Sequence, residues 1–506
     1  MIIMRATLLF FILIANLAAT SQEIIYSVPH REDNVDINFE IIGKVSGNFM
    51  VFKNSGNRHT LQVFNNNMVE LRNDRLNFLS DRTLQVNFIA YPDFFYMIYQ
   101  TQKGNILFCY YAQFNGAGEK MGDPVLLDTT KVGVFSENKI YSTAYSEDKN
   151  YILISKSRTD NNEVSYVTKR YSRTMQLIDS AKQIFRYNRR HDTYTDLQID
   201  NKGTIIFAKE KMKGAREMIN EASLITLPLG ASQTLFTALN LNEKYIDELK
   251  IKIDNLNQDY ILNSLYFTRI SGNVEGLYSA RLNDQLTETK ASFIPFPDSV
   301  RAKFSNARYR SAFDDMFLRN MFLKKDGSFL VIGEDFSSQT SGSRWDRWDY
   351  MYGSPYPYDY YWYRPGYYNY YSPYRNYSRN VNTHFMYDNI LIMDIDSNLL
   401  PRWTKLIFKN QSDDNNDSYL SYSTLNTGTE ILFLFIEKGK NTQVVTCQGL
   451  SPDGSINRYA TLKSREKGFQ FMPRLAKQTG LKEIVMPVVY RSMISFAKVD
   501  FSKPAN

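Results

Sequence analysis

Short apolar segments alternate with polar turns along most of this chain. One pattern, an apolar strand that runs into a turn, occurs eight times. The eight strands end at Phe64, Phe114, Tyr171, Leu227, Leu282, Ile395, Leu450 and Val499. Successive ends are 50, 57, 56, 55, 113, 55 and 49 residues apart. Seven of the eight turns are rich in Asn, Asp, Gly or Ser, which tolerate turn geometry. We therefore expect a repeat, with one double-length interval.

A second pattern supports the same repeat. Nearly continuous apolar runs, which are typical of strands covered on both faces, recur in the units. Several of these runs follow a hairpin signal such as Asp326-Gly327 or Thr427-Gly428. The units also open with a similar patch, namely Tyr194-x-Asp196, Tyr245-x-Asp247, Phe313-x-Asp315 and Tyr419-x-Ser421. Each unit is therefore expected to hold four strands.

Four strands in about 50 residues is the size of a β-propeller blade. The last unit stops before its fourth strand, whereas residues 23–28 form a spare strand before the first unit. Pairing of these two ends would close the ring and leave no strand edge open at the seam. We therefore predict an all-β protein, a single β-propeller of about eight four-stranded blades, with seven as the alternative. The propeller would span residues 22–506. Tandem β-sandwiches would not produce this period, and an open β-solenoid would not need matching chain ends.

The N-terminal residues 1–21 are expected to be a signal peptide. One basic residue precedes an apolar run from Ala6 to Leu17, and small residues follow at positions 18–21. A retained anchor is the alternative, although the run is short for a bilayer span. No other stretch approaches membrane-spanning length. The mature chain is therefore expected to be soluble and exported, to the periplasm or the cell exterior.

The repeat pattern resembles that of exported bacterial β-propellers, with their strand–Asp-Gly–strand units, over the whole mature chain. The resemblance is at the level of the superfamily. WD dipeptides that close blades, kelch double glycines and the S-x-D-x-G motifs of sialidases are all absent. A likeness of fold does not specify a function.

The double-length interval contains an aromatic insertion, residues 336–386, between the second and third strands of the sixth unit. Thirteen tyrosines lie between Tyr350 and Tyr377, and four prolines there exclude a long helix or a regular central strand. Aromatic and arginine side chains suit contact with sugar rings or a partner protein. The alternative is a low-complexity loop that packs on itself. The candidate ligand-binding residues are Trp345, Trp348, Tyr350, Tyr352, Tyr358, Tyr360, Trp362, Arg364 and Tyr367.

The remaining chemistry of the chain is sparse. The net charge of +7 is spread along the sequence without a basic run, so we expect no nucleic-acid partner. The four histidines have no metal-ligand spacing, and we expect no metal and no cofactor. Cys109 and Cys447 are read as buried small hydrophobes. Asp394-x-Asp396-x-Asn398 lacks the glycine and distal glutamate of a calcium loop and predicts a turn.

Three aspartates form the only catalytic candidate. Asp196, Asp247 and Asp315 recur where the innermost strand begins, so they could gather at the mouth of a central channel and act as acid–base groups on glycosides. The alternative is that each caps backbone N–H groups of its own blade. The acidic cluster Asp413, Asp414 and Asp417 is interpreted as a solvated loop.

These observations favour a non-enzymatic binding or scaffolding protein of the cell envelope or exterior. It would contact a glycan or an envelope protein through the face that carries the insertion. The alternative is a carbohydrate-active enzyme of the glycoside hydrolase type that uses the three aspartates. The oligomeric state is not predicted.

Overall fold

The computed structural model describes residues 23–30, 38–55, 58–133, 139–160, 162–188, 190–213, 218–270, 272–287, 289–304, 313, 315–340, 343–345, 383–414, 417–438, 443–462 and 468–502. The predicted signal peptide, residues 1–21, lies outside these ranges.

The strands follow one another around a ring and are grouped here as blades 1 to 8. Blade 1 contains β2 (Asn38–Val45), β3 (Asn48–Ser55), β4 (Arg58–Phe64) and β5 (Glu70–Arg75), and blade 2 contains β6 (Thr83–Ala90), β7 (Phe94–Lys103), β8 (Ile106–Asn115) and β9 (Val125–Lys131). Blade 3 contains β10 (Tyr141–Tyr145), β11 (Tyr151–Asp160), β12 (Glu163–Ser172) and β13 (Leu177–Arg186). Blade 4 contains β14 (Asp192–Tyr194), β15 (Gln198–Ile199), β16 (Ile205–Lys213), β17 (Met218–Leu227) and β18 (Leu235–Ala238).

Blade 5 contains β19 (Tyr245–Ile246), β20 (Lys250–Asp254), β21 (Asp259–Phe267), β22 (Gly276–Asn283) and β23 (Thr289–Pro295). Blade 6 contains β24 (Met316–Leu323), β25 (Phe329–Thr340), β26 (Ser343–Trp345), β27 (Thr383–Ile395), β28 (Pro401–Ile407) and β29 (Gln411–Asp414). Blade 7 contains β30 (Tyr422–Asn426), β31 (Ile431–Lys438), β32 (Gln443–Leu450) and β33 (Ile456–Arg458), and blade 8 contains β34 (Phe469–Phe471), β35 (Lys477–Gly480), β36 (Glu483–Tyr490), β37 (Met493–Asp500) and β1 (Glu23–Tyr26). The short helices α2 (Asp298–Phe304) and η3 (Pro473–Leu475) lie between blades 5 and 6 and within blade 8.

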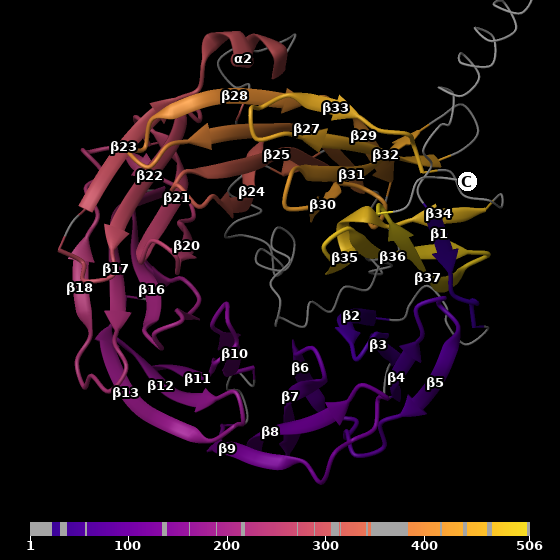
Figure 1. The fold of residues 1–506 in the computed structure, drawn as a ribbon. Coiled ribbons are helices and arrows are strands. Elements are labelled where there is room, and N and C mark those ends of the chain that lie inside the picture. The colour runs from indigo at the N-terminus through magenta and orange to yellow at the C-terminus, as the bar shows by residue number, and fades with distance from the viewer. Residues whose placement is uncertain are drawn as a thin grey trace, which may run out of the picture.

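Within the described residues the strands form seven antiparallel hydrogen-bonded sheets arranged around a centre (Figure 1). Six of these sheets carry one blade each. The seventh has ten strands and carries blades 4 and 5, because the single pair Ile219↔Ile246 joins β17 to β19. Blades 4, 5 and 8 each have two short strands at the innermost position. The predicted all-β propeller is confirmed, with eight four-strand sets in seven sheets.

The core is divided among the interfaces between blades. Eight apolar clusters of described residues each join two neighbouring blades. Phe52 and Phe88, for example, meet between blades 1 and 2 with ring centroids 5.3 Å apart. Phe39 and Phe496 meet between blades 1 and 8 at 5.5 Å. Each blade therefore buries its faces against its neighbours, as in other repeat architectures.

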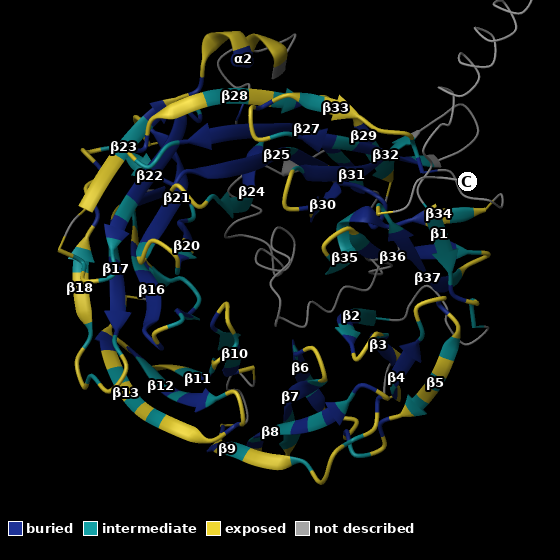
Figure 2. Cartoon of the chain, viewed as in Figure 1, coloured by how far each residue is buried: buried dark blue, intermediate teal, exposed yellow. Residues whose placement is uncertain are grey.

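Burial falls from the middle strands to the rim of the ring (Figure 2). The middle strands β3, β21 and β36 are almost entirely buried, which explains their continuous apolar runs. The outer strands β5, β9 and β13 alternate or are exposed. No helix among the described residues has the length and apolar character needed to cross a membrane.

The ring is closed by the chain ends, as predicted. β1 pairs with β37 in the register Glu23↔Asp500 and Ile24↔Val499, and becomes the outermost strand of blade 8. Ser27 extends this pairing, because its N–H donates to the carbonyl of Phe496 at 2.8 Å. The N-terminal strand therefore completes the C-terminal blade.

The turns after the third strand share a local design in several blades. The Asn115 Oδ1 atom accepts hydrogen bonds from the N–H groups of Ala117 and Glu119, both at 2.9 Å. Asp396 does the same for the N–H groups two and four residues later, at 2.8 Å each. The residue before the second donor has a positive φ, 77° at Gly118 and 65° at Leu399. Short polar side chains thus fold these turns locally, which confirms the turn predicted at Asp394-x-Asp396-x-Asn398.

Candidate functional site

The two middle strands of blade 6, β25 and β27, are longer than the strands of the other blades. Past a register shift between Glu334 and Phe336, β25 pairs with β27 from Phe336↔Tyr387 to Thr340↔Thr383. The short strands β26 and β29 flank this hairpin on its two sides. We call these four strand segments, residues 336–340, 343–345, 383–387 and 411–414, the stem, because residues 346–382, the rest of the aromatic insertion, are attached to it. The stem connects the second and third strands of blade 6.

Most of the candidate ligand-binding residues lie outside the described part of the chain. Trp345 is the last residue of β26, and its backbone pairs with Ser338. The remaining candidates, Trp348, Tyr350, Tyr352, Tyr358, Tyr360, Trp362, Arg364 and Tyr367, fall within residues 346–382, outside the described ranges.

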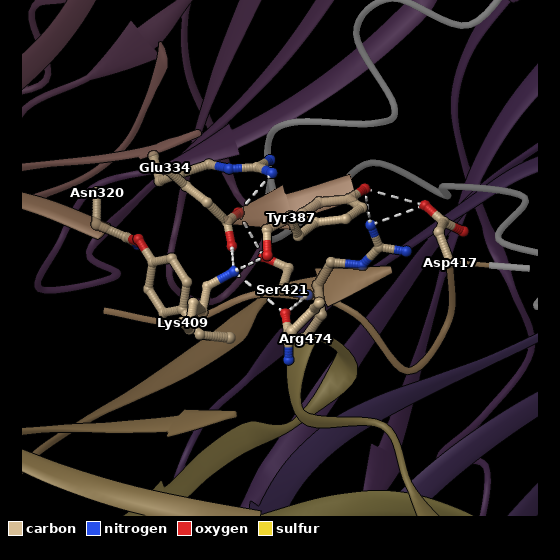
Figure 3. Close-up of polar contacts among 10 residues, drawn as sticks. Asn320, Glu334, Tyr387, Lys409, Asp417, Ser421 and Arg474 are labelled. Atoms are coloured by element: carbon tan, nitrogen blue, oxygen red, sulfur yellow. Dashed lines mark hydrogen bonds and ion pairs between the residues drawn. The ribbon is translucent and has the colours of Figure 1, made fainter. Parts of the chain in front are cut away.

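A buried ion-pair network lies at the base of the stem (Figure 3). Glu334, on β25, has no solvent-exposed side-chain surface. Its carboxylate lies 2.8 Å from the Lys409 Nζ atom and 2.7 Å from an Arg319 nitrogen. The hydroxyl of Ser421, from the segment that enters blade 7, donates to the same carboxylate at 2.6 Å. Three charged groups and a hydroxyl therefore join blades 6 and 7.

The surroundings keep this network charged. Burial alone would raise the pKa of Glu334, but Lys409 and Arg319 outweigh it and hold the pKa below its usual value. Burial lowers the pKa of Lys409, and the neighbouring Glu334 opposes that shift. Lys409 also donates to the carbonyl of Tyr387 at 2.9 Å and to Gln411 Oε1 at 3.1 Å. Removal of one partner would leave a buried charge without compensation.

A second set of contacts extends the network to blade 8. The Tyr387 hydroxyl, at the first residue pair of the stem, donates to Asp417 Oδ2 at 3.0 Å. Arg474, in η3, donates to the Tyr387 hydroxyl at 2.6 Å and to Asp417 at 3.0 Å. The interpretation of Asp417 as part of a solvated loop was therefore wrong, because Arg474 from a distant part of the chain pairs with it. Asp414 instead pairs with His384 at 2.7 Å on the stem surface.

Polar residues at the same strand position link other blades as well. Gln100 on β7 accepts a hydrogen bond from the N–H of Tyr141 at 3.2 Å, and Glu210 on β16 accepts one from the N–H of Leu249 at 2.9 Å. In both cases the donor belongs to the next blade. Glu334 uses the same kind of link, but with two cations added.

The three candidate catalytic aspartates differ in their surroundings. Asp247 is buried and accepts hydrogen bonds from the Ser264 hydroxyl at 2.7 Å and the Leu265 N–H at 3.2 Å, which are contacts within its own blade. Asp196 and Asp315 are half-buried, and the Asp315 carbonyl accepts the N–H of Phe336 at 2.8 Å. Among the described residues, no three His, Cys, Asp or Glu side chains are placed to hold a metal ion.

The two cysteines are buried and not bonded to each other, as expected. Burial raises the pKa of the Cys109 thiol to about 12, and that of Cys447 similarly. Thiolate chemistry at these positions is therefore suppressed.

The ring of radial four-stranded blades defines the class of this protein as a β-propeller. No protein family and no curated protein matches its sequence. Solved structures match distantly. Prolyl oligopeptidase B from Galerina marginata matches with a TM-score of 0.40 and 10% identity over 91% of this chain and 56% of that chain. Polysaccharide lyase Uly1 matches with a TM-score of 0.40 and 9% identity over 82% and 89%, and a PL25 ulvan lyase with 0.36 and 10% over 81% and 90%.

Sequence reasoning did not identify the network at the base of the stem. One signal was present, because Glu334 follows the apolar run from Phe329 to Gly333 in a strand expected to be covered on both faces. Its partners Lys409 and Arg319 lie 75 and 15 residues away along the chain, with no pattern that connects them.

Proposed function

We propose that this chain is a non-enzymatic binding or scaffolding protein, exported to the periplasm or the cell exterior. It would contact a glycan or an envelope protein through the face that carries the stem and the aromatic insertion. The observation that supports this proposal is the buried network of Glu334, Lys409, Arg319 and Ser421 at the base of the stem.

The network supports the proposal because it restrains the stem. Glu334 lies immediately before the register shift at which the stem begins, and Tyr387 lies at the first residue pair beyond it. Contacts from Ser421 and Arg474 connect these two residues to blades 7 and 8. A restrained base presents an attached segment at lower entropic cost on binding than a free loop would.

The composition of the insertion favours a glycan as the first partner to test. Tyrosine and tryptophan offer stiff apolar faces with a polar tip, and arginine adds hydrogen-bonding forks. The test uses the mature chain, residues 22–506, and a variant whose residues 346–382 are replaced by an equally long Gly/Ser segment. Both proteins would be applied to an array of defined bacterial and algal glycans.

We expect the wild-type chain to retain at least one glycan class and the Gly/Ser variant to lose this binding at least tenfold, with an unchanged melting temperature. A matched control carries Lys202→Ala and Asn255→Ala, in turns after the first strands of blades 4 and 5 on the opposite face of the ring. This control should bind as the wild type does. Equal binding by all three proteins would overturn the proposal.

The enzymatic alternative is separated by a different set of variants. If the chain cleaves glycans with Asp196, Asp247 and Asp315, Asn substitutions of these residues should abolish turnover and leave binding to the array intact. A binding protein should show no glycan turnover before or after the substitutions.

A further inference from the structure

The outer rim of three consecutive blades is unusually apolar. Large hydrophobic side chains on β9, β13 and β18 are close to half exposed. These strands lie at the rim of the ring and are largely coloured as exposed in Figure 2. These residues are Val125, Leu126, Leu177, Ile178, Ile184, Leu235 and Phe236. Exposed apolar patches of this kind mark interaction surfaces on proteins.

The middle of this patch is an open sheet edge. β13 has ten residues, whereas the outer strands of the other blades have between three and seven. Within the described residues, β13 pairs only with β12, so its other edge offers a row of backbone donors and acceptors. Proteins usually shorten or cover such edges.

The sequence of β13 is complementary to itself. Two copies of β13 can pair antiparallel about a twofold axis that is perpendicular to the sheet and places Ala181 opposite Ala181 of the second copy. Residues that are opposite each other in this pairing point to the same side of the sheet. In this register Ile178 faces Ile184 of the second copy, and Ser180 faces Lys182. These side chains lie on the exposed side of the strand. Asp179 would face Gln183 on the other side, so apolar residues meet apolar ones and polar residues meet polar ones.

The neighbouring rims fit the same symmetry. β18 is adjacent to β13, because Gln183 donates to the carbonyl of Ser232 at 3.0 Å and the rings of Phe185 and Phe236 lie 5.9 Å apart. A twofold axis through Ala181 places β18 opposite β18 of the second copy and β9 opposite its own counterpart. The exposed apolar residues of all three strands would then flank one contact.

We infer that two copies of this chain associate through β13, which joins blade 3 of each propeller into one continuous eight-stranded sheet. The mature wild-type chain should sediment with twice the mass of one chain at micromolar concentration. Ile184→Lys should weaken this association at least tenfold, because it places a charge opposite Ile178 of the second copy. Leu71→Lys, at an equally exposed position on β5, should leave the mass unchanged.

A cysteine experiment tests the register. In Ala181→Cys the two new thiols lie opposite each other across the axis and should form a disulfide-linked dimer under oxidation. In Ser180→Cys the equivalent atoms are diagonal neighbours about 7–8 Å apart and should not crosslink. Native Cys109 and Cys447 are buried and do not interfere. A monomeric wild-type chain, or crosslinking of Ser180→Cys in preference to Ala181→Cys, would overturn the inference.

Discussion

Two buried glutamates at the same position of different blades have different hydrogen-bond and ion-pair partners. Glu210 and Glu334 each lie seven residues after the glycine of the preceding turn, and each bonds to the next blade. Glu334 has two buried cations beside it and a lowered pKa. Glu210 accepts a hydrogen bond from the Leu249 N–H, and Lys250 nearby pairs with Glu248. Burial therefore raises the pKa of Glu210 to about 8.

This difference predicts a pH effect on stability. Folded Glu210 keeps its proton up to about pH 8, whereas in the unfolded chain the group ionises near its usual pKa of 4.5. The unfolded state therefore binds fewer protons between these values, and the free energy of unfolding falls as the pH rises through this window. Glu210→Gln should remove this fall, which amounts to about 2 kcal/mol between pH 6 and pH 8. Urea unfolding at the two pH values measures it.

Glu334→Gln is the matched control for this experiment. It removes the negative partner of two buried cations, so it should destabilise the chain by about 3–5 kcal/mol at both pH values. A Glu210→Gln variant whose stability follows that of the wild type from pH 6 to pH 8 would contradict the ionisation behaviour assigned to Glu210.

At the scale of the element, the turns after the third strands depend on single polar side chains. Asp396→Ala removes the acceptor for two N–H groups and leaves Leu399 at a positive φ of 65°. We expect this change to lower the free energy of unfolding by about 1–2 kcal/mol. Asp396→Asn keeps an acceptor oxygen and should cost less than half as much. Equal losses in the two variants would show that charge, and not the acceptor, stabilises the turn.

This local character explains why the fold could be predicted from the sequence. Strand runs and turns such as the one at Asp396 are encoded within a few residues, so the repeat, the four-strand unit and the ring could be predicted. The pairing of Asp417 with Arg474 could not, because the two lie 57 residues apart in different blades. Glu334 and Lys409 present the same difficulty. Buried polar links between blades become visible only when the ring places the blades side by side.

At the scale of the molecule, the ring depends on one short seam. Eight interfaces hold the blades together, and blade 8 takes its outermost strand from the opposite end of the chain. Pairing of β1 with β37 therefore converts an open stack into a closed ring. Opening the seam would expose a strand edge and would remove Ile24 and Tyr26 from the cluster against which they pack. The seam is therefore expected to limit the cooperativity of unfolding.

A disulfide across the seam tests this view. Glu23 and Asp500 are directly paired at its end, at a Cα separation of about 4.5–5.5 Å for such pairs, which suits a disulfide. The double variant Glu23→Cys/Asp500→Cys should oxidise without denaturant and gain about 3–5 kcal/mol in the free energy of unfolding, because the bond closes nearly the whole chain into one loop. Glu23→Cys alone, and the reduced double variant, should match the wild type within about 0.5 kcal/mol. If the oxidised form gains nothing, the seam does not open before the blades unfold, and the ring is held instead by its interfaces between blades.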